Sequence, residues 1–134
     1  MAPRDGEVLP LRFGWFWAAV GWSGVGLGIV LSMLPRAMMP VPLGGTAQHL
    51  AGYFILTAWF AGIYPSARYP DVGLGCFLFG CSMELLQILS PTRHPQLQDA
   101  LTNAVGILAA LAFAYAGLGG WAAPVEKLLG VAPR

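Results

Sequence analysis

Charged residues are scarce in this sequence. Only 10% of its 134 residues are Asp, Glu, Lys or Arg, whereas a soluble domain carries about 25%. Hydrophobic residues make up 57% of the chain, so the composition indicates a membrane protein with room for one small domain. The formal net charge is +1, and a phosphate-binding surface needs clustered Lys and Arg. We therefore predict no nucleic-acid partner.

Cysteines and familiar cofactor motifs are also few. Cys76 and Cys81 are five residues apart, a spacing that turns their side chains about 140° away from each other on a helix. We expect buried free thiols, not a disulfide or a metal pair. The sequence contains no Walker loop, haem ligand pair or zinc motif. It therefore predicts no metal site and no cofactor.

Four apolar stretches stand out against this background. Each is about 20 residues long, the length of helix that crosses a hydrocarbon core about 30 Å thick. They cover residues 13–34, 47–64, 72–90 and 100–119. Proline-rich breaks separate them, and proline ends helices because it lacks an amide donor and restricts the residue before it. The predicted fold is all-α: a small integral membrane bundle of four transmembrane helices (residues 13–119), with an N-terminal arm (1–12) and a short tail (120–134).

The distribution of positive charge predicts the orientation of these helices. Five basic residues fall on the side of both termini: Arg4, Arg12, Arg68, Lys127 and Arg134. Two fall on the opposite side: Arg36 and Arg93. Because loops rich in Lys and Arg stay in the cytoplasm, we predict that both termini are cytoplasmic. The first and third loops then face outward.

Polar residues gather between Glu84 and Gly106, in the stretch "ELLQILSPTRHPQLQDALTNAVG". Successive helices alternate in direction. One end of the bundle therefore holds the end of the third span, the starts of the second and fourth spans, and the loop between the third and fourth. The polar residues at that end are His49, Tyr53, Glu84, Gln87, Arg93, Asp99 and Asn103. Within each helix two of them are three or four residues apart and so share one helical face: His49 with Tyr53, Glu84 with Gln87, and Asp99 with Asn103. We predict a polar site there.

Glu84 is the strongest single indication of a functional site. With the third helix ending near Ser90, its carboxylate lies about 9 Å inside the span. An unpaired charge at that depth costs about 2–3 kcal/mol or more, and ionisable residues inside membranes are functional by default. A proton, Arg93, His49 or a bound ligand would offset this cost, and the sequence leaves these alternatives open.

Each of the other polar residues also has a structural explanation. Gln87 and Asn103 taken alone suit hydrogen bonds between membrane helices, at about 0.6 kcal/mol each. Asp99 taken alone suits the N-cap of the fourth helix. His49 taken alone suits an interfacial position. The occurrence of all of them at one end favours a site.

Small residues form a row on the first span. Gly24 and Gly28 make a GxxxG motif, and Ser32 extends it by one turn. Such rows permit close approach of two helices. The sequence does not distinguish a contact inside the bundle from a contact with a protein partner.

The segments "QHLAGYFIL", "ELLQ" and "RHPQLQDALTNAVG" together resemble the VanZ-like membrane proteins. In that family a histidine opens one helix, Glu-x-x-Gln closes the next, and an arginine precedes the pattern D-x-x-x-N-x-x-G. The matching positions here are His49, Glu84, Gln87, Arg93, Asp99, Asn103 and Gly106, and the resemblance covers residues 46–113. The family's frequent acid and lysine before the histidine are replaced by Gly45 and Thr46, and a frequent acid or serine by Gln96.

This resemblance implies a protein of the bacterial inner membrane that acts on the cell envelope. The family is named for a protein linked to glycopeptide (teicoplanin) resistance. We expect membrane lipids as partners. One function hypothesis is that the outward site binds or modifies a lipid or glycolipid headgroup. In that case Glu84 and His49 are a coupled acid and base, Asp99 orients the histidine or Arg93, and the headgroup is bound by Arg93, Gln87, Asn103 and Tyr53.

A second hypothesis comes from a different class. The chain is small, carries the Gly24/Gly28/Ser32 row and lacks the family's lysine, which suits a non-catalytic accessory subunit or assembly factor of a larger membrane complex. In that case the polar residues hold the helices together. A transporter is disfavoured because four helices leave little room for alternating access. The sequence does not distinguish catalysis from binding.

Overall fold

The structure is a computed structural model that describes residues 8–40, 44–92 and 94–131. Within these residues it contains five α-helices and no strand. The helices are α1 (Gly14–Met33), α2 (Gly45–Ile63), α3 (Tyr69–Gln87), α4 (Leu97–Phe113) and α5 (Ala122–Leu128). Short 3₁₀ turns precede α2 and α3 (η1, Arg36–Met38; η2, Ser66–Arg68), and a π-helical turn follows α4 (η3, Ala114–Leu118). The all-α prediction is confirmed.

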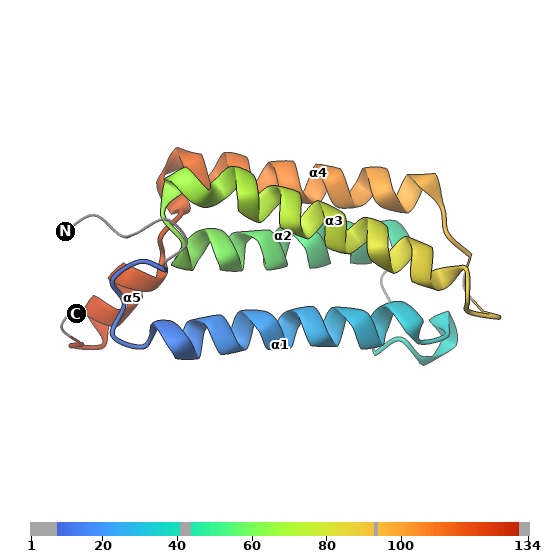
Figure 1. The fold of residues 1–134 in the computed structure, drawn as a ribbon, viewed down its shortest axis with the longest axis horizontal. Helices are drawn as coiled ribbons and strands as arrows, with labels where there is room; N and C mark the ends of the chain where they lie inside the picture. Colours follow the sequence, from blue (N-terminus) through green and yellow to red (C-terminus); the bar gives the residue numbers. More distant parts are fainter. Residues whose placement is uncertain (1–7, 41–43, 93, 132–134) are drawn as a thin grey trace.

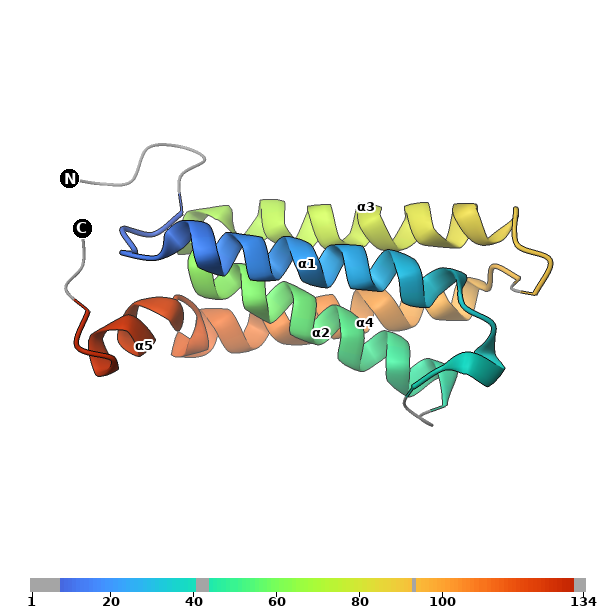
Figure 2. The ribbon, with the colours of Figure 1, turned by 90° about the horizontal axis from the view of Figure 1, so that it is seen from below.

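The four long helices lie lengthwise beside one another, each antiparallel to the next in the chain (Figure 1), with α5 at one end beside the start of α1. The view from below shows the same lengthwise arrangement (Figure 2). Consecutive helices therefore alternate in direction. The ends of α1 and α3 and the starts of α2 and α4 lie together at the end of the bundle away from α5.

Three helix boundaries differ from the sequence prediction by three residues. α3 begins at Tyr69 and ends at Gln87, and α4 begins at Leu97. Pro70 lies in the first turn of α3, where its missing amide donor has no helical partner to lose. The predicted proline-rich break before residue 72 therefore ends earlier, ahead of Tyr69. Glu84 consequently lies one turn from the end of α3, which is shallower than predicted.

The apolar core lies at the α5 end. Leu11, Phe60, Ile63 and Ala122 form one buried cluster, against which Trp17 and Trp121 pack. A second cluster of Ala61, Tyr69 and Ala114 lies beside it. Cys76 and Cys81 are both free thiols, as predicted, but only Cys76 is buried and Cys81 is partly exposed. The strongest apolar packing is thus at the opposite end of α2 from His49.

Glu126 ties the start of α1 to α5. Its carboxylate accepts hydrogen bonds from Arg12 N (2.7 Å), Phe13 N (2.9 Å) and Trp17 Nε1 (2.9 Å). Burial opposes ionisation of this group, but the donors from Phe13, Trp17 and Arg12 outweigh it and hold the pKa of Glu126 below its ordinary value. The amides of Arg12 and Phe13 lie just before Gly14, the first residue of α1, so a carboxylate from a distant part of the chain holds the chain where it enters the helix.

Two helical segments are long and apolar enough to cross a membrane: Gly14–Met33 and Leu97–Leu118. Polar residues lower the mean hydropathy of the other two long helices, namely Gln48 and His49 in α2 and Asp71 and Glu84 in α3. Length and composition therefore identify two candidate spans where the sequence reading has four. The four-span arrangement stays a prediction.

Candidate functional site

His49 is the centre of the polar cluster. Its Nδ1 lies 2.9 Å from Asn103 Oδ1, and its Nε2 lies 3.5 Å from Asp99 Oδ2. Because Asp99 and Asn103 are one turn apart on α4, both face the first turns of α2. The two side chains on α4 therefore hold both nitrogens of one imidazole ring. Asp99 and Asn103 are 5% and 1% exposed.

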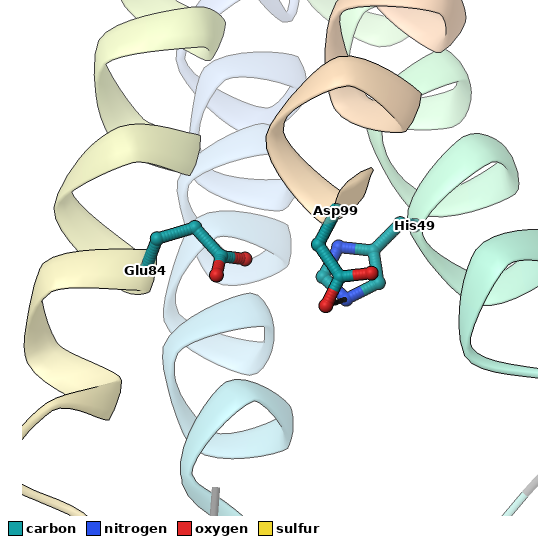
Figure 3. A group of neighbouring side chains, drawn as sticks. All are labelled: His49, Glu84 and Asp99. Carbon is teal, nitrogen blue, oxygen red and sulfur yellow. Dashed lines mark ion pairs between the residues drawn. The ribbon is translucent and has the colours of Figure 1, made fainter. Parts of the chain in front are cut away.

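Glu84 enters the cluster from α3. Figure 3 shows its carboxylate pointing toward Asp99 and His49. One ligand atom from each of His49, Glu84 and Asp99 can be chosen so that all three lie within 4.8 Å of one another. Glu84 Oε2 also accepts a hydrogen bond of 3.1 Å from Gln96 N, at the start of α4. Three helices thus each contribute one side chain with a possible ligand atom to a single small space.

Two glycines allow the helices to come this close. A Cβ on Gly106 would lie 2.5 Å from the carbonyl oxygen of Leu50, the residue after His49. A Cβ on Gly80 would lie 3.0 Å from Asn103 Nδ2. A side chain at Gly106 would push α4 away from α2, and a side chain at Gly80 would press on the Asn103 amide and the Tyr53 ring. Small residues therefore set the spacing of the cluster.

Gln87 and Tyr53 lie at the edge of this cluster. Gln87 Nε2 donates to Ser32 O at 3.3 Å and so joins the end of α3 to the end of α1. The Tyr53 ring packs against Phe79, with ring centroids 6.0 Å apart. Both residues line the groove described next. Arg93 lies outside the described residues, and its predicted role stays a prediction.

A groove of about 510 Å³ lies between α1 and α2, beside α3, and reaches His49. Apolar and small residues of both helices line most of it, including Leu27, Ile55 and Leu56. Gln48, His49 and Gln87 line its polar end. This volume falls in the range of small-molecule pockets, about 300–1,000 Å³. The groove is therefore apolar along its length and polar where it meets the cluster.

The GxxxG row faces this groove. Gly24, Gly28 and Ser32 all line it, and a Cβ on Gly24 or Gly28 would contact Leu56 of α2 or Phe79 of α3. A protein partner on this row would therefore have to enter the groove. The partner proposed for this face stays a prediction.

Asp99 is not the N-cap of α4. That helix begins at Leu97 with Gln96 as its N-cap residue, so Asp99 occupies the third helical position. Its carboxylate faces His49 instead of the free amides of its own helix. The structural explanation given above for Asp99 alone is therefore wrong.

The sequence reading missed three features. It expected no metal site, yet His49, Glu84 and Asp99 form a group whose ligand atoms lie close enough to bind one ion. It did not identify Glu126, a single glutamate in the tail with no local pattern to mark it. It also missed the groove. The row of small residues on α1 is the sequence feature that could have predicted a gap beside that helix.

Comparisons of the chain with protein-family models, with curated proteins and with solved structures found no match.

Proposed function

We propose that this chain is a four-span membrane protein, similar to VanZ-like proteins, that binds an envelope lipid with its headgroup at His49. The observation that carries the proposal is the position of His49, which lies both in the polar cluster and at the end of an apolar groove. A lipid has the matching form, with a polar head on an apolar chain.

The outer surface of the bundle supports the membrane location. Only 6% of the apolar window of α1 is buried, whereas the core helix of a soluble protein is mostly buried. Exposed apolar side chains also continue around the other helices, among them Ile55 on α2, Leu78 on α3 and Leu108 on α4. Apolar surfaces of this extent belong in contact with lipid or with another protein. All four long helices carry them.

The groups at and beside the polar end of the groove suit a hydroxylated headgroup. Glu84 and His49 supply an acid and a base close together, and Asp99 orients the imidazole. Gln87, Asn103 and Tyr53 add polar contacts. The excess of Lys and Arg on the side of the termini supports an outward-facing position for this end of the bundle in the bacterial inner membrane. Envelope lipids that carry sugars or phosphates are exposed on that face.

The proposal is tested in cells by replacing His49 and Glu84 together. A strain lacking the protein is complemented with wild type, with the double variant His49→Ala/Glu84→Gln, or with His94→Gln, an exposed histidine outside the cluster. Glycopeptide susceptibility and the envelope lipid profile are measured at equal protein levels. We expect the double variant to resemble the empty strain. If it complements as fully as His94→Gln does, the headgroup site is wrong.

A second function is supported by the exposed apolar surface of the same helices. An accessory subunit of a larger membrane complex would cover part of this surface with another protein. In that case gentle extraction recovers a stoichiometric protein partner that withstands Glu84→Gln. A monodisperse protein that carries only lipid contradicts this second function.

A further inference from the structure

We propose that His49, Glu84 and Asp99 bind one divalent metal ion of the zinc or manganese class. Each residue comes from a different helix, and their ligand atoms lie within 4.8 Å of one another. The inference goes beyond the proposed function, because an ion would bind here whatever molecule the groove accepts.

The first argument is charge. Glu84 is 8% exposed and Asp99 is 5% exposed, so both carboxylates lie away from water. Two buried carboxyl groups directed into one small space offer oxygen ligands of the kind that divalent cations bind. Among the described side chains, Asp99 has only His49 as an ion-pair partner, and no lysine or arginine pairs with Glu84. A metal ion supplies the positive charge that the described part of the cluster lacks.

The second argument is the tautomer of His49. Asn103 Oδ1 is an acceptor, so the proton of a neutral imidazole lies on Nδ1. The lone pair on Nε2 is then directed toward the Asp99 carboxylate. Histidines that bind metals almost always donate their other ring N–H to such an oxygen, which fixes the ring and raises its basicity. Asn103 provides this support here.

The third argument is distance. A proton shared between His49 and Asp99 would form a charge-assisted hydrogen bond of about 2.7–2.9 Å. The observed separation between Nε2 and Oδ2 is 3.5 Å. Two ligands bound to one tetrahedral ion at about 2.1 Å each lie about 3.4 Å apart. Glu84 reaches the same ion by a side-chain adjustment of about 1–1.5 Å.

The donor set indicates the class of metal. One imidazole nitrogen with carboxylate oxygens suits Zn²⁺ and Mn²⁺ better than the soft ions that select thiolates. Three protein ligands leave at least one position open, as in catalytic zinc sites. The His49 side chain is 18% exposed and lines the groove, so an ion has a route to the site and a groove ligand has a route to the ion.

The test measures binding of the metal alone to the delipidated full-length chain. Protein carrying a histidine-free tag is purified in detergent, stripped with chelator and dialysed against Zn²⁺ or Mn²⁺. Bound metal is then counted by mass spectrometry of the elements. We expect one ion per wild-type chain. Glu84→Gln and His49→Gln should each weaken binding by at least the 10–100-fold that loss of a supporting residue causes, and Asn103→Leu should weaken it by about 10–100-fold.

Matched controls separate this site from surface binding. His94→Gln and Asp71→Asn remove an exposed histidine and an exposed carboxylate, and both variants should still bind one ion. Metal should also raise the melting temperature of wild type and leave that of Glu84→Gln unchanged. This measurement requires only that the isosteric variant Glu84→Gln folds. If it does not fold, the melting temperature of Asp99→Asn with and without metal tests the same site.

Three results would overturn the metal site: binding far below one ion per chain at millimolar metal, equal binding by Glu84→Gln, or loss of binding in His94→Gln. The assay contains no lipid, so it is independent of the proposed function. A metal-binding protein with no bound lipid would leave this inference standing and remove the proposed function. A lipid-binding protein that takes no metal would do the reverse.

Discussion

His49 Nδ1 and Asn103 Oδ1 lie 2.9 Å apart and join the first turns of α2 and α4 by a hydrogen bond. The bond is buried on the α4 side, where Asn103 is 1% exposed. It fixes which nitrogen of His49 carries the proton, and it turns the other nitrogen toward Asp99. The chemistry available to the cluster therefore depends on a neutral residue that does not itself act as an acid or a base.

Replacing Asn103 with leucine tests how much this hydrogen bond contributes to the stability of the fold. Leucine has a similar size but offers no acceptor, so Nδ1 of His49 loses its partner. We expect the free energy of unfolding to fall by about 1–3 kcal/mol, the cost of a buried unsatisfied donor. Unfolding of the purified protein in mixed detergent measures it. The matched control is Thr102→Val, because Thr102 Oγ1 bonds only within α4, to Gln98 O. Equal effects of the two changes would contradict this role of Asn103.

Glu126 predicts a dependence of stability on pH at the other end of the bundle. Its pKa in the folded chain lies below its ordinary value of 4.5, so the ionised form stabilises the fold above that pH. This contribution is lost as the pH falls through the lowered folded pKa. We expect Glu126→Gln to cost about 1–2 kcal/mol at pH 7 and progressively less as the pH falls below 4.5.

Unfolding measured at several pH values checks this prediction. The control is Asp71→Asn, since the exposed pair of Asp71 with Arg68 should contribute under about 1 kcal/mol. A cost of Glu126→Gln that grows as the solution becomes more acidic would show that the sign is wrong.

Filling the groove should separate lipid binding from the polar cluster. Gly24 lines the groove, so Gly24→Leu places a side chain in the space proposed for the lipid chain. Gly26 lies on the same helix with no atom within 4 Å of an added Cβ, and Gly26→Leu is the matched control. Lipid carried through purification should fall several-fold in Gly24→Leu alone, while metal binding is unchanged in both. Equal lipid content in the two variants would mean that the groove is not the binding site.

The orientation of the bundle is tested with reporters. With both termini in the cytoplasm, a fluorescent protein fused after Arg134 should fluoresce and a periplasmic phosphatase at that position should be inactive. The same phosphatase inserted in the loop between α3 and α4 should be active. Phosphatase activity at the C-terminus would reverse the predicted topology.

The sequence predicted the position of the cluster better than its details. Alternating apolar stretches were sufficient to bring His49, Glu84 and Asp99 to one end, because helix direction alone determines that. The N-cap explanation of Asp99 was wrong because it depends on where α4 begins, and moving that start by three residues changes a cap into an inward-facing side chain. The alternative that the sequence left open, an Asp99 that faces His49, matches the structure. The helix ends depend on packing against neighbours, which a proline pattern does not specify.

Two other features depend on tertiary packing still more. Glu126 is distant in sequence from the amides that it binds, and no local motif marks such a contact. The groove is a space left between α1 and α2, so it follows from how their side chains fit together. The small residues of α1 indicated close approach of a helix, and the structure places a partly open groove beside them.

The most direct test of the central claim is native mass spectrometry of the protein, extracted gently from its own membrane. The account predicts a wild-type chain that retains a polar-headed envelope lipid. That lipid should be lost in His49→Ala and in Glu84→Gln and kept in His94→Gln. A lipid retained equally by all four proteins, or a stoichiometric protein partner with no lipid, would contradict a headgroup site at His49.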